Sequence, residues 1–213
     1  MKGRTSLVAA AVLTVALWIA GVVVENALPS NIADGASDAQ VLAWVKHNDG
    51  TLIVGAWLFM LGCVAFVVFA GLLRDRFARA EGGNHLLANI MFGGAIAAAV
   101  CGLGTNADIA SAINKNDVSP ATAGAFHHLG DLFFMGMELM VVPFIAAACV
   151  LAFRAAVLPR WWAVVGLVVA VVLVIGPIGW AALIFGTPIW TVGTSLLAGR
   201  ASRRRAVAAP ATA

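Results

Sequence analysis

One apolar stretch of the chain carries four side chains that could take up a proton or bind a cation: His127, His128, Asp131 and Glu138. In a helix, at about 100° per residue, Asp131 lies about 40° from His127 and Glu138 about 20° from it, so these three form one stripe. His128 lies beside the stripe, within reach of Asp131 one turn later. Ionisable side chains inside a membrane-spanning helix are costly and mark functional sites by default. The pattern predicts a proton or cation pathway, or a polar pocket.

Glu138 has no cationic partner in the sequence pattern, because no Lys or Arg lies inside an apolar stretch. Asp131 can pair with either histidine. We expect Glu138 to lie near the middle of the bilayer in its neutral, hydrogen-bonded form, since an unpaired buried carboxylate is strongly disfavoured. Its candidate hydrogen-bond partners at compatible depths on other stretches are Thr14, Asn89 and Thr191. The competing interpretation is a set of buried hydrogen bonds that only fixes the bundle.

A metal site is a weaker interpretation of the same residues. His127, His128 and Asp131, joined by His47 or Asp49, could in principle bind zinc or iron. Adjacent histidines on a helix point about 100° apart, which is poor geometry for one ion. We therefore expect no metal and no cofactor. The motifs GxSxG, HExxH and GxxxxGKS/T are missing, which makes an enzyme the least favoured class.

The elements that must position these residues are membrane-spanning helices. The chain is 62% hydrophobic and 11% charged, whereas a soluble domain has about 25% charged residues. Only helices or closed barrels satisfy backbone hydrogen bonds in lipid, and each apolar stretch is about long enough to cross a core of about 30 Å as a helix. We expect one all-α transmembrane domain over residues 1–199 and a disordered, Arg-rich cytoplasmic tail over 200–213. The six expected spans lie near 5–24, 51–73, 84–104, 121–152, 160–177 and 180–199.

The distribution of the thirteen Lys and Arg residues predicts the orientation of this six-helix bundle. With the amino end in the cytoplasm, only Lys46 and Lys115 lie outside and all other basic residues lie inside. This asymmetry is what the positive-inside rule predicts for a protein with both termini in the cytoplasm. The basic residues then contact anionic lipid headgroups, and no nucleic-acid partner is needed to explain them.

Local signals refine the expected helices. Ser37, with Gln40 three residues later, predicts a helix start, and Asp49-Gly50 predicts its end. We expect this short helix to lie on the outer membrane surface as part of the first outer loop. Ser119-Pro120 predicts an early start for the fourth helix.

Two glycine–proline segments interrupt the last apolar region of the chain. The segment 176–179 predicts the turn between the fifth and sixth spans, and the segment 186–188 (Gly-Thr-Pro) interrupts the sixth span as a kink or a functional break.

The third span carries small residues at four-residue intervals: Gly94, Ala98 and Gly102. Such a face lets another helix approach closely. It predicts close packing and, as a partner, a second copy of the chain in a homo-oligomer through span three.

The segment before the fifth span reads Phe-Arg-Ala-Ala-Val-Leu-Pro-Arg-Trp over residues 153–161. With the six-span layout, the long first outer loop and the Arg-rich end, it resembles an uncharacterised family of small bacterial integral-membrane proteins. The resemblance implies a multi-pass protein of the bacterial cytoplasmic membrane without an assigned activity. Our leading hypothesis is a small transporter, channel or proton-coupled binding protein that uses the stripe of the fourth span. The alternatives are a non-catalytic scaffold or accessory subunit and, less favoured, a metal- or cofactor-binding membrane enzyme.

Overall fold

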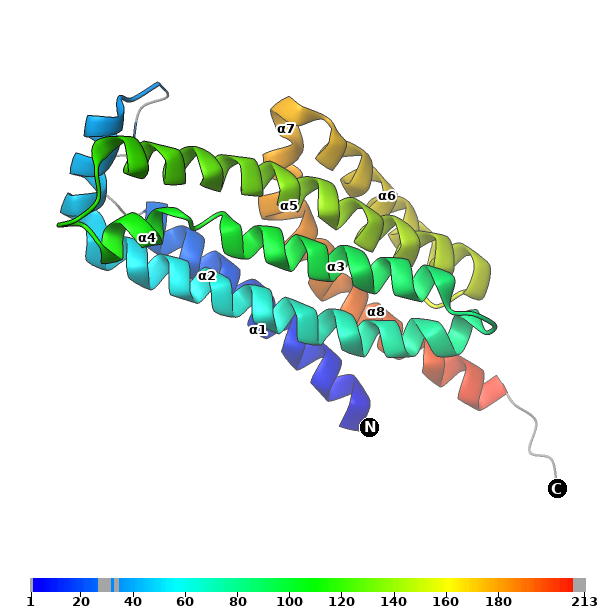
Figure 1. Cartoon of the computed structure of the whole chain (residues 1–213). Helices are drawn as coiled ribbons and strands as arrows, with labels where there is room; N and C mark the ends of the chain where they lie inside the picture. The colour runs from blue at the N-terminus through cyan, green and yellow to red at the C-terminus, as the bar shows by residue number, and fades with distance from the viewer. Residues whose placement is uncertain (1, 27–31, 33–34, 209–213) are drawn as a thin grey trace.

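The computed structural model describes residues 2–26, 32 and 35–208, and in these residues it contains helices and no strand (Figure 1). Five helical stretches are long and apolar enough to cross a membrane, and the apolar helix α6 is shorter, with 15 residues. The prediction of an all-helical membrane fold is therefore confirmed. The elements are α1 (Lys2–Asn26), α2 (Asp38–Glu81), α3 (Leu86–Gly104), α4 (Asp108–Ile113), α5 (Pro120–Ala155), α6 (Arg160–Val174), α7 (Gly176–Ala181), a π-helical turn (Ala182–Gly186) and α8 (Thr187–Ala208).

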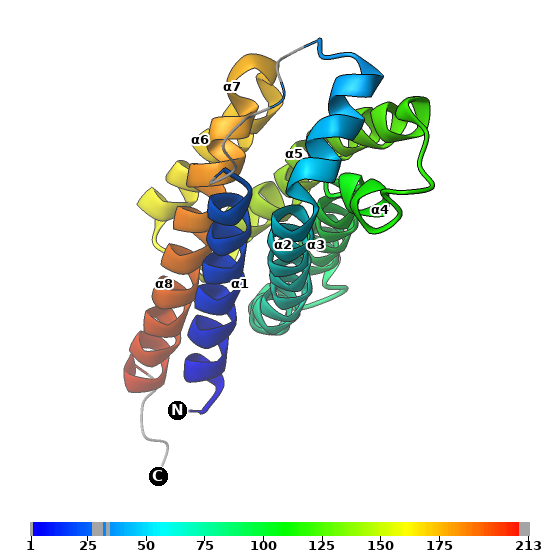
Figure 2. The same cartoon turned by 90° about the vertical axis from the view of Figure 1, so that its left-hand side faces the viewer.

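The helices form an elongated bundle in which α1 packs along α2, and α3 packs along both α2 and α5. Helix α6 packs on α5, and α8 packs on α1. The start of α1, the end of α8 and the turns α2–α3 and α5–α6 lie at one end of the bundle (Figures 1 and 2). We call this the basic end, because the last turns of α2 and α5 and the start of α6 bring Arg74, Arg76, Arg79, Arg154 and Arg160 there.

The opposite end carries an extension, because α2 has 44 residues. At 1.5 Å per residue it is about 66 Å long, about twice the thickness of a hydrocarbon core. The first part of α2, helix α4 and the start of α5 group together there (Figure 2). They enclose a small apolar cluster separate from the main core, and we call this region the cap. Its buried residues are Val41, Leu42, Val45, Leu52, Ala112 and Ala123.

The prediction that a separate short helix ends at Asp49-Gly50 is wrong. The helix begins after Ser37 as expected, where the Ser37 backbone N–H donates to Gln40 Oε1 at 2.8 Å. It then continues through Gly50 into the membrane-spanning part of α2. Residues on both sides of the expected end are held by the cap, since Asp49 forms an ion pair with Lys115 and Leu52 is buried in the cap cluster. Tertiary packing here overrides a weak local stop signal.

The small-residue face of α3 is occupied within the chain. A side chain at Gly94 would place its Cβ 2.7 Å from the backbone nitrogen of Phe144 on α5, and one at Gly102 would lie 2.7 Å from Cys63 Sγ on α2. Ala98 is fully buried. The close approach predicted for this face therefore joins α3 to its neighbours in the same chain, and a second copy could reach it only by displacing them.

The two predicted interruptions near the carboxyl end differ in kind. Helix α6 ends at Val174 and α7 begins at Gly176, so the chain bends at Ile175, and the segment 176–179 that was expected to form the turn is itself the start of α7. At Gly186-Thr187-Pro188 the chain does not break but winds as a π-helical turn into α8. There the Thr187 hydroxyl donates to the Ala182 carbonyl at 3.2 Å. Short π-helical segments inside helices often accompany functional sites.

Candidate functional site

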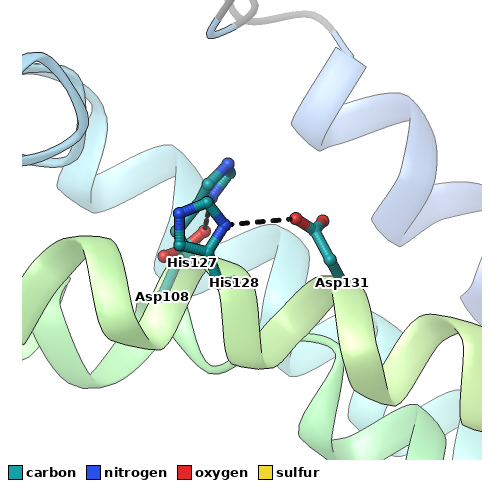
Figure 3. A network of polar contacts seen from close by, with 4 residues as sticks. All are labelled: Asp108, His127, His128 and Asp131. Carbon is teal, nitrogen blue, oxygen red and sulfur yellow. Dashed lines mark hydrogen bonds and ion pairs between the residues drawn. The ribbon is translucent and has the colours of Figure 1, made fainter. Parts of the chain in front are cut away.

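The four side chains of α5 that the sequence singled out, His127, His128, Asp131 and Glu138, do not share one environment. His127 is joined to α4, since its Nδ1 lies 2.9 Å from Asp108 Oδ2 (Figure 3). The two side chains are only 28% and 21% exposed. The Oδ1 atom of Asp108 is buried without a hydrogen-bond partner in the part of the chain that the structure describes. The pair therefore fixes α4 on α5 and leaves one carboxylate oxygen with unused hydrogen-bonding capacity.

His128 and Asp131 lie on the surface of α5 beside this pair (Figure 3). Their side chains are 75% and 67% exposed, and His128 Nδ1 is 3.9 Å from Asp131 Oδ2. This distance allows an ion pair but is too long for a hydrogen bond. An exposed pair of this kind contributes little to stability. Asp131 thus pairs with His128, while His127 turns inward to Asp108.

A further carboxylate, at the end of α1, reaches the same region. Glu25 packs against α2 where the chain has Gly55, and a Cβ at that glycine would lie 2.7 Å from the Glu25 Cγ. The Asp108 carboxylate is close enough to Glu25 for their negative charges to repel each other. We call Glu25, Asp108 and His127 the three-helix cluster, since they come from α1, α4 and α5.

The sequence interpretation missed Glu25 and Asp108. They lie far from His127 along the chain, and helical periodicity relates only residues of one helix. A signal for them does exist in the sequence. Glu25 ends the first apolar stretch and Asp108 follows the third, so both are expected at the same membrane boundary.

Glu138 is the deeply placed acid of α5, with 7% of its surface exposed. It forms no hydrogen bond or ion pair with any other described residue, and its carboxyl packs beneath α7. A Cβ at Gly179 would lie 3.1 Å from Glu138 Oε2. Along α5, Glu138 is about 24 Å from Arg154. This rise along the helix is most of the thickness of a 30 Å hydrocarbon core.

None of the three expected partners is hydrogen-bonded to this carboxyl in the structure. The Thr14 hydroxyl donates to the Ala10 carbonyl at 2.9 Å within α1. Asn89 Oδ1 accepts from the Arg74 guanidinium at 2.8 Å, at the basic end. The Thr191 hydroxyl is buried, with no hydrogen-bond partner among the described residues.

In the described part of the chain, no group of three or more His, Cys, Asp or Glu side chains is arranged to hold a metal ion. The three cysteines are free thiols. The chemistry that this arrangement offers is uptake and release of protons by carboxyl and imidazole groups.

Comparison with known proteins places the chain in a family. The family model described as a domain of unknown function (DUF4386) matches residues 9–198, which is most of the chain. No curated protein and no solved structure matches it. The match and the apolar helices together confirm the resemblance to an uncharacterised membrane family. The chain belongs to the DUF4386 family, and it is a multi-pass membrane protein.

Proposed function

We propose that this protein is a small transport protein that carries protons across the membrane, with Glu138 as the central proton-binding group. The observation that carries the proposal is that the acidic residue Glu138 has only 7% of its surface exposed and makes no ion pair in the described residues. A lone carboxylate in this position would be strongly destabilised, so the group holds a proton. A side chain that can gain and lose a proton inside the bundle is the central requirement of a proton pathway.

The three-helix cluster is the access site of this pathway. His127 and Asp108 are partly exposed, so water reaches them, and their hydrogen bond lets a proton pass between imidazole and carboxylate. His127 and Glu138 are eleven residues apart on α5, about 16 Å. This distance is too long for direct transfer, so the proposal requires bound water between the two sites.

Buried hydroxyl groups extend the proposed pathway from Glu138 toward the basic end. Thr187 and Thr191 on α8, and Thr14 on α1, are fully buried, and α1 packs on α8. Hydroxyl groups both donate and accept hydrogen bonds, so they suit the inner half of a proton pathway. In this assignment Thr14 and Thr191 serve the pathway as relay groups, and Glu138 is bonded to another acceptor.

The cap faces the outside of the cytoplasmic membrane in the orientation that we propose, with both termini inside. The arginines at the basic end support this orientation. The basic residues of the cap are only Lys46 and Lys115, and the charge of Lys115 is paired with that of Asp49. The positive-inside rule favours this orientation, and anionic lipid headgroups are the expected contacts of the basic end. The bacterial cytoplasmic membrane suits such a chain.

The proposal is tested in liposomes that contain the purified protein and a trapped pH-sensitive dye. A potassium gradient with valinomycin sets the membrane potential, and the dye reports proton uptake. We expect the wild type to exceed empty liposomes and Glu138→Gln to abolish the difference. Asp75→Asn is the matched control, because it removes an exposed carboxylate at the basic end, and it should retain the flux. Wild-type uptake equal to that of empty liposomes would refute the proposal.

A further inference from the structure

The turn between α6 and α7 leaves one buried backbone carbonyl without a partner. In a continuous helix the Leu173 carbonyl would accept from the N–H of residue 177, but that residue is Pro177, which has no N–H. The neighbouring N–H groups bond elsewhere: that of Ile175 to Val172 at 3.0 Å, and that of Gly179 to Ile175 at 3.0 Å. Leu173 is 1% exposed. Within the described residues, its carbonyl is a buried acceptor that needs a donor.

The Glu138 carboxyl lies beside this carbonyl. A Cβ on Gly179 would lie 2.9 Å from the Leu173 oxygen and 3.1 Å from Glu138 Oε2. Both oxygens therefore border the same position, which is empty only because residue 179 is glycine. A protonated carboxyl supplies one O–H donor, and that donor is what the Leu173 carbonyl lacks.

We infer that Glu138 binds its proton as a hydrogen bond to the Leu173 carbonyl, and that Pro177 and Gly179 are the positioning residues of this site. Pro177 withholds the competing N–H, and Gly179 leaves room for the carboxyl. The inference rests on the proposed function and deepens it by naming the acceptor of the Glu138 proton. Two oxygens are too few for Mg²⁺ or Ca²⁺, which take six or more ligands.

On the helices packed against α5, the titratable groups that come near this part of the chain are two thiols, Cys63 of α2 beside Met137 and Cys101 of α3 beside Gly136. Residues 161–186, which include α7 and nearly all of α6, contain no Asp, Glu, His, Cys, Lys or Arg. On α5 itself the nearest are Asp131, two turns toward the cap, and Cys149, three turns toward the basic end. No neighbouring charge therefore competes with the carbonyl for the proton.

Infrared spectroscopy of the protein in lipid nanodiscs tests the inference without any transport measurement. A neutral carboxylic acid has its own C=O stretching band, which moves to lower frequency when the acid donates a hydrogen bond. We expect wild type to show such a band at neutral pH and Glu138→Gln to lose it. Pro177→Ala supplies an N–H to the Leu173 carbonyl, so the band should move to higher frequency.

Two glycine variants provide the matched pair. Gly179→Ala crowds both oxygens and should shift the band, whereas Gly176→Ala meets nothing within 4 Å and should not. Thermal unfolding checks that each variant is folded. Absence of a Glu138-dependent band, or a band unchanged in both Pro177→Ala and Gly179→Ala, overturns the inference. The expected band shifts without proton flux would refute the proposed function alone, whereas flux with an unaltered band would refute the hydrogen bond alone.

Discussion

Two adjacent glycines of α3 allow the packing of the bundle to be tested with one kind of substitution. Gly94 faces α5, where an added Cβ would lie 2.7 Å from the Phe144 backbone nitrogen and 3.0 Å from Pro143 Cγ. Gly93 faces away from the bundle, and a Cβ there meets nothing within 4 Å. We predict that Gly94→Ala destabilises the protein and Gly93→Ala does not.

The magnitude follows from two opposing effects. Alanine is favoured over glycine inside a helix by about 1 kcal/mol, and this gain is common to both variants. Overpacking costs about 1–3 kcal/mol, and at Gly94 the obstacle is backbone that cannot rotate away. The difference in unfolding free energy between Gly93→Ala and Gly94→Ala should therefore equal the packing cost alone, about 1–3 kcal/mol.

Reversible unfolding in mixed detergent micelles, followed by far-UV circular dichroism, measures both variants against the wild type. Sedimentation of each variant reports its association state in parallel. Equal stabilities of the two variants would contradict the close contact between α3 and α5. If Gly94→Ala changed association and left unfolding unaltered, the small-residue face would serve an oligomer instead.

Three further predictions address the cluster, a helix start and the orientation. A double-mutant cycle with Asp108→Asn and His127→Gln should give a coupling of about 1 kcal/mol in unfolding free energy, and a coupling near zero would show that the pair of Figure 3 does not form. Glu81→Ala should destabilise the protein by about 1 kcal/mol, because this carboxylate accepts the N–H groups of Leu87 and Ala88 in the first turn of α3, both at 2.9 Å; chemical unfolding would measure the loss, and wild-type stability would contradict it. In a background without native cysteines, a membrane-impermeant maleimide added to intact cells should label Asn116→Cys but not Asn84→Cys, and the reverse result would invert the proposed orientation.

The place of Glu138 in the bundle cannot be read from its position along α5 alone. Glu138 lies near the middle of its helix by number, but the first turns of α5 belong to the cap. The relevant reference is the basic end, and from Arg154 the carboxyl is about 24 Å away. Only the packing of α4 and α2 against the start of α5 shows that those turns belong to the cap.

The sequence by itself determined the all-helical membrane class, because apolar length and charge depletion act locally and lipid permits few other folds. It also determined the start of α5, where Ser119 Oγ accepts from the Thr122 N–H at 3.2 Å, since a helix cap is a contact among near neighbours. Tertiary structure alone decided that α2 continues past Gly50 and that Asp108 meets His127. It alone placed the Glu138 carboxyl beside the turn at Pro177. Each of these depends on helices far apart in the chain coming together, and helical periodicity carries no information about which faces will meet.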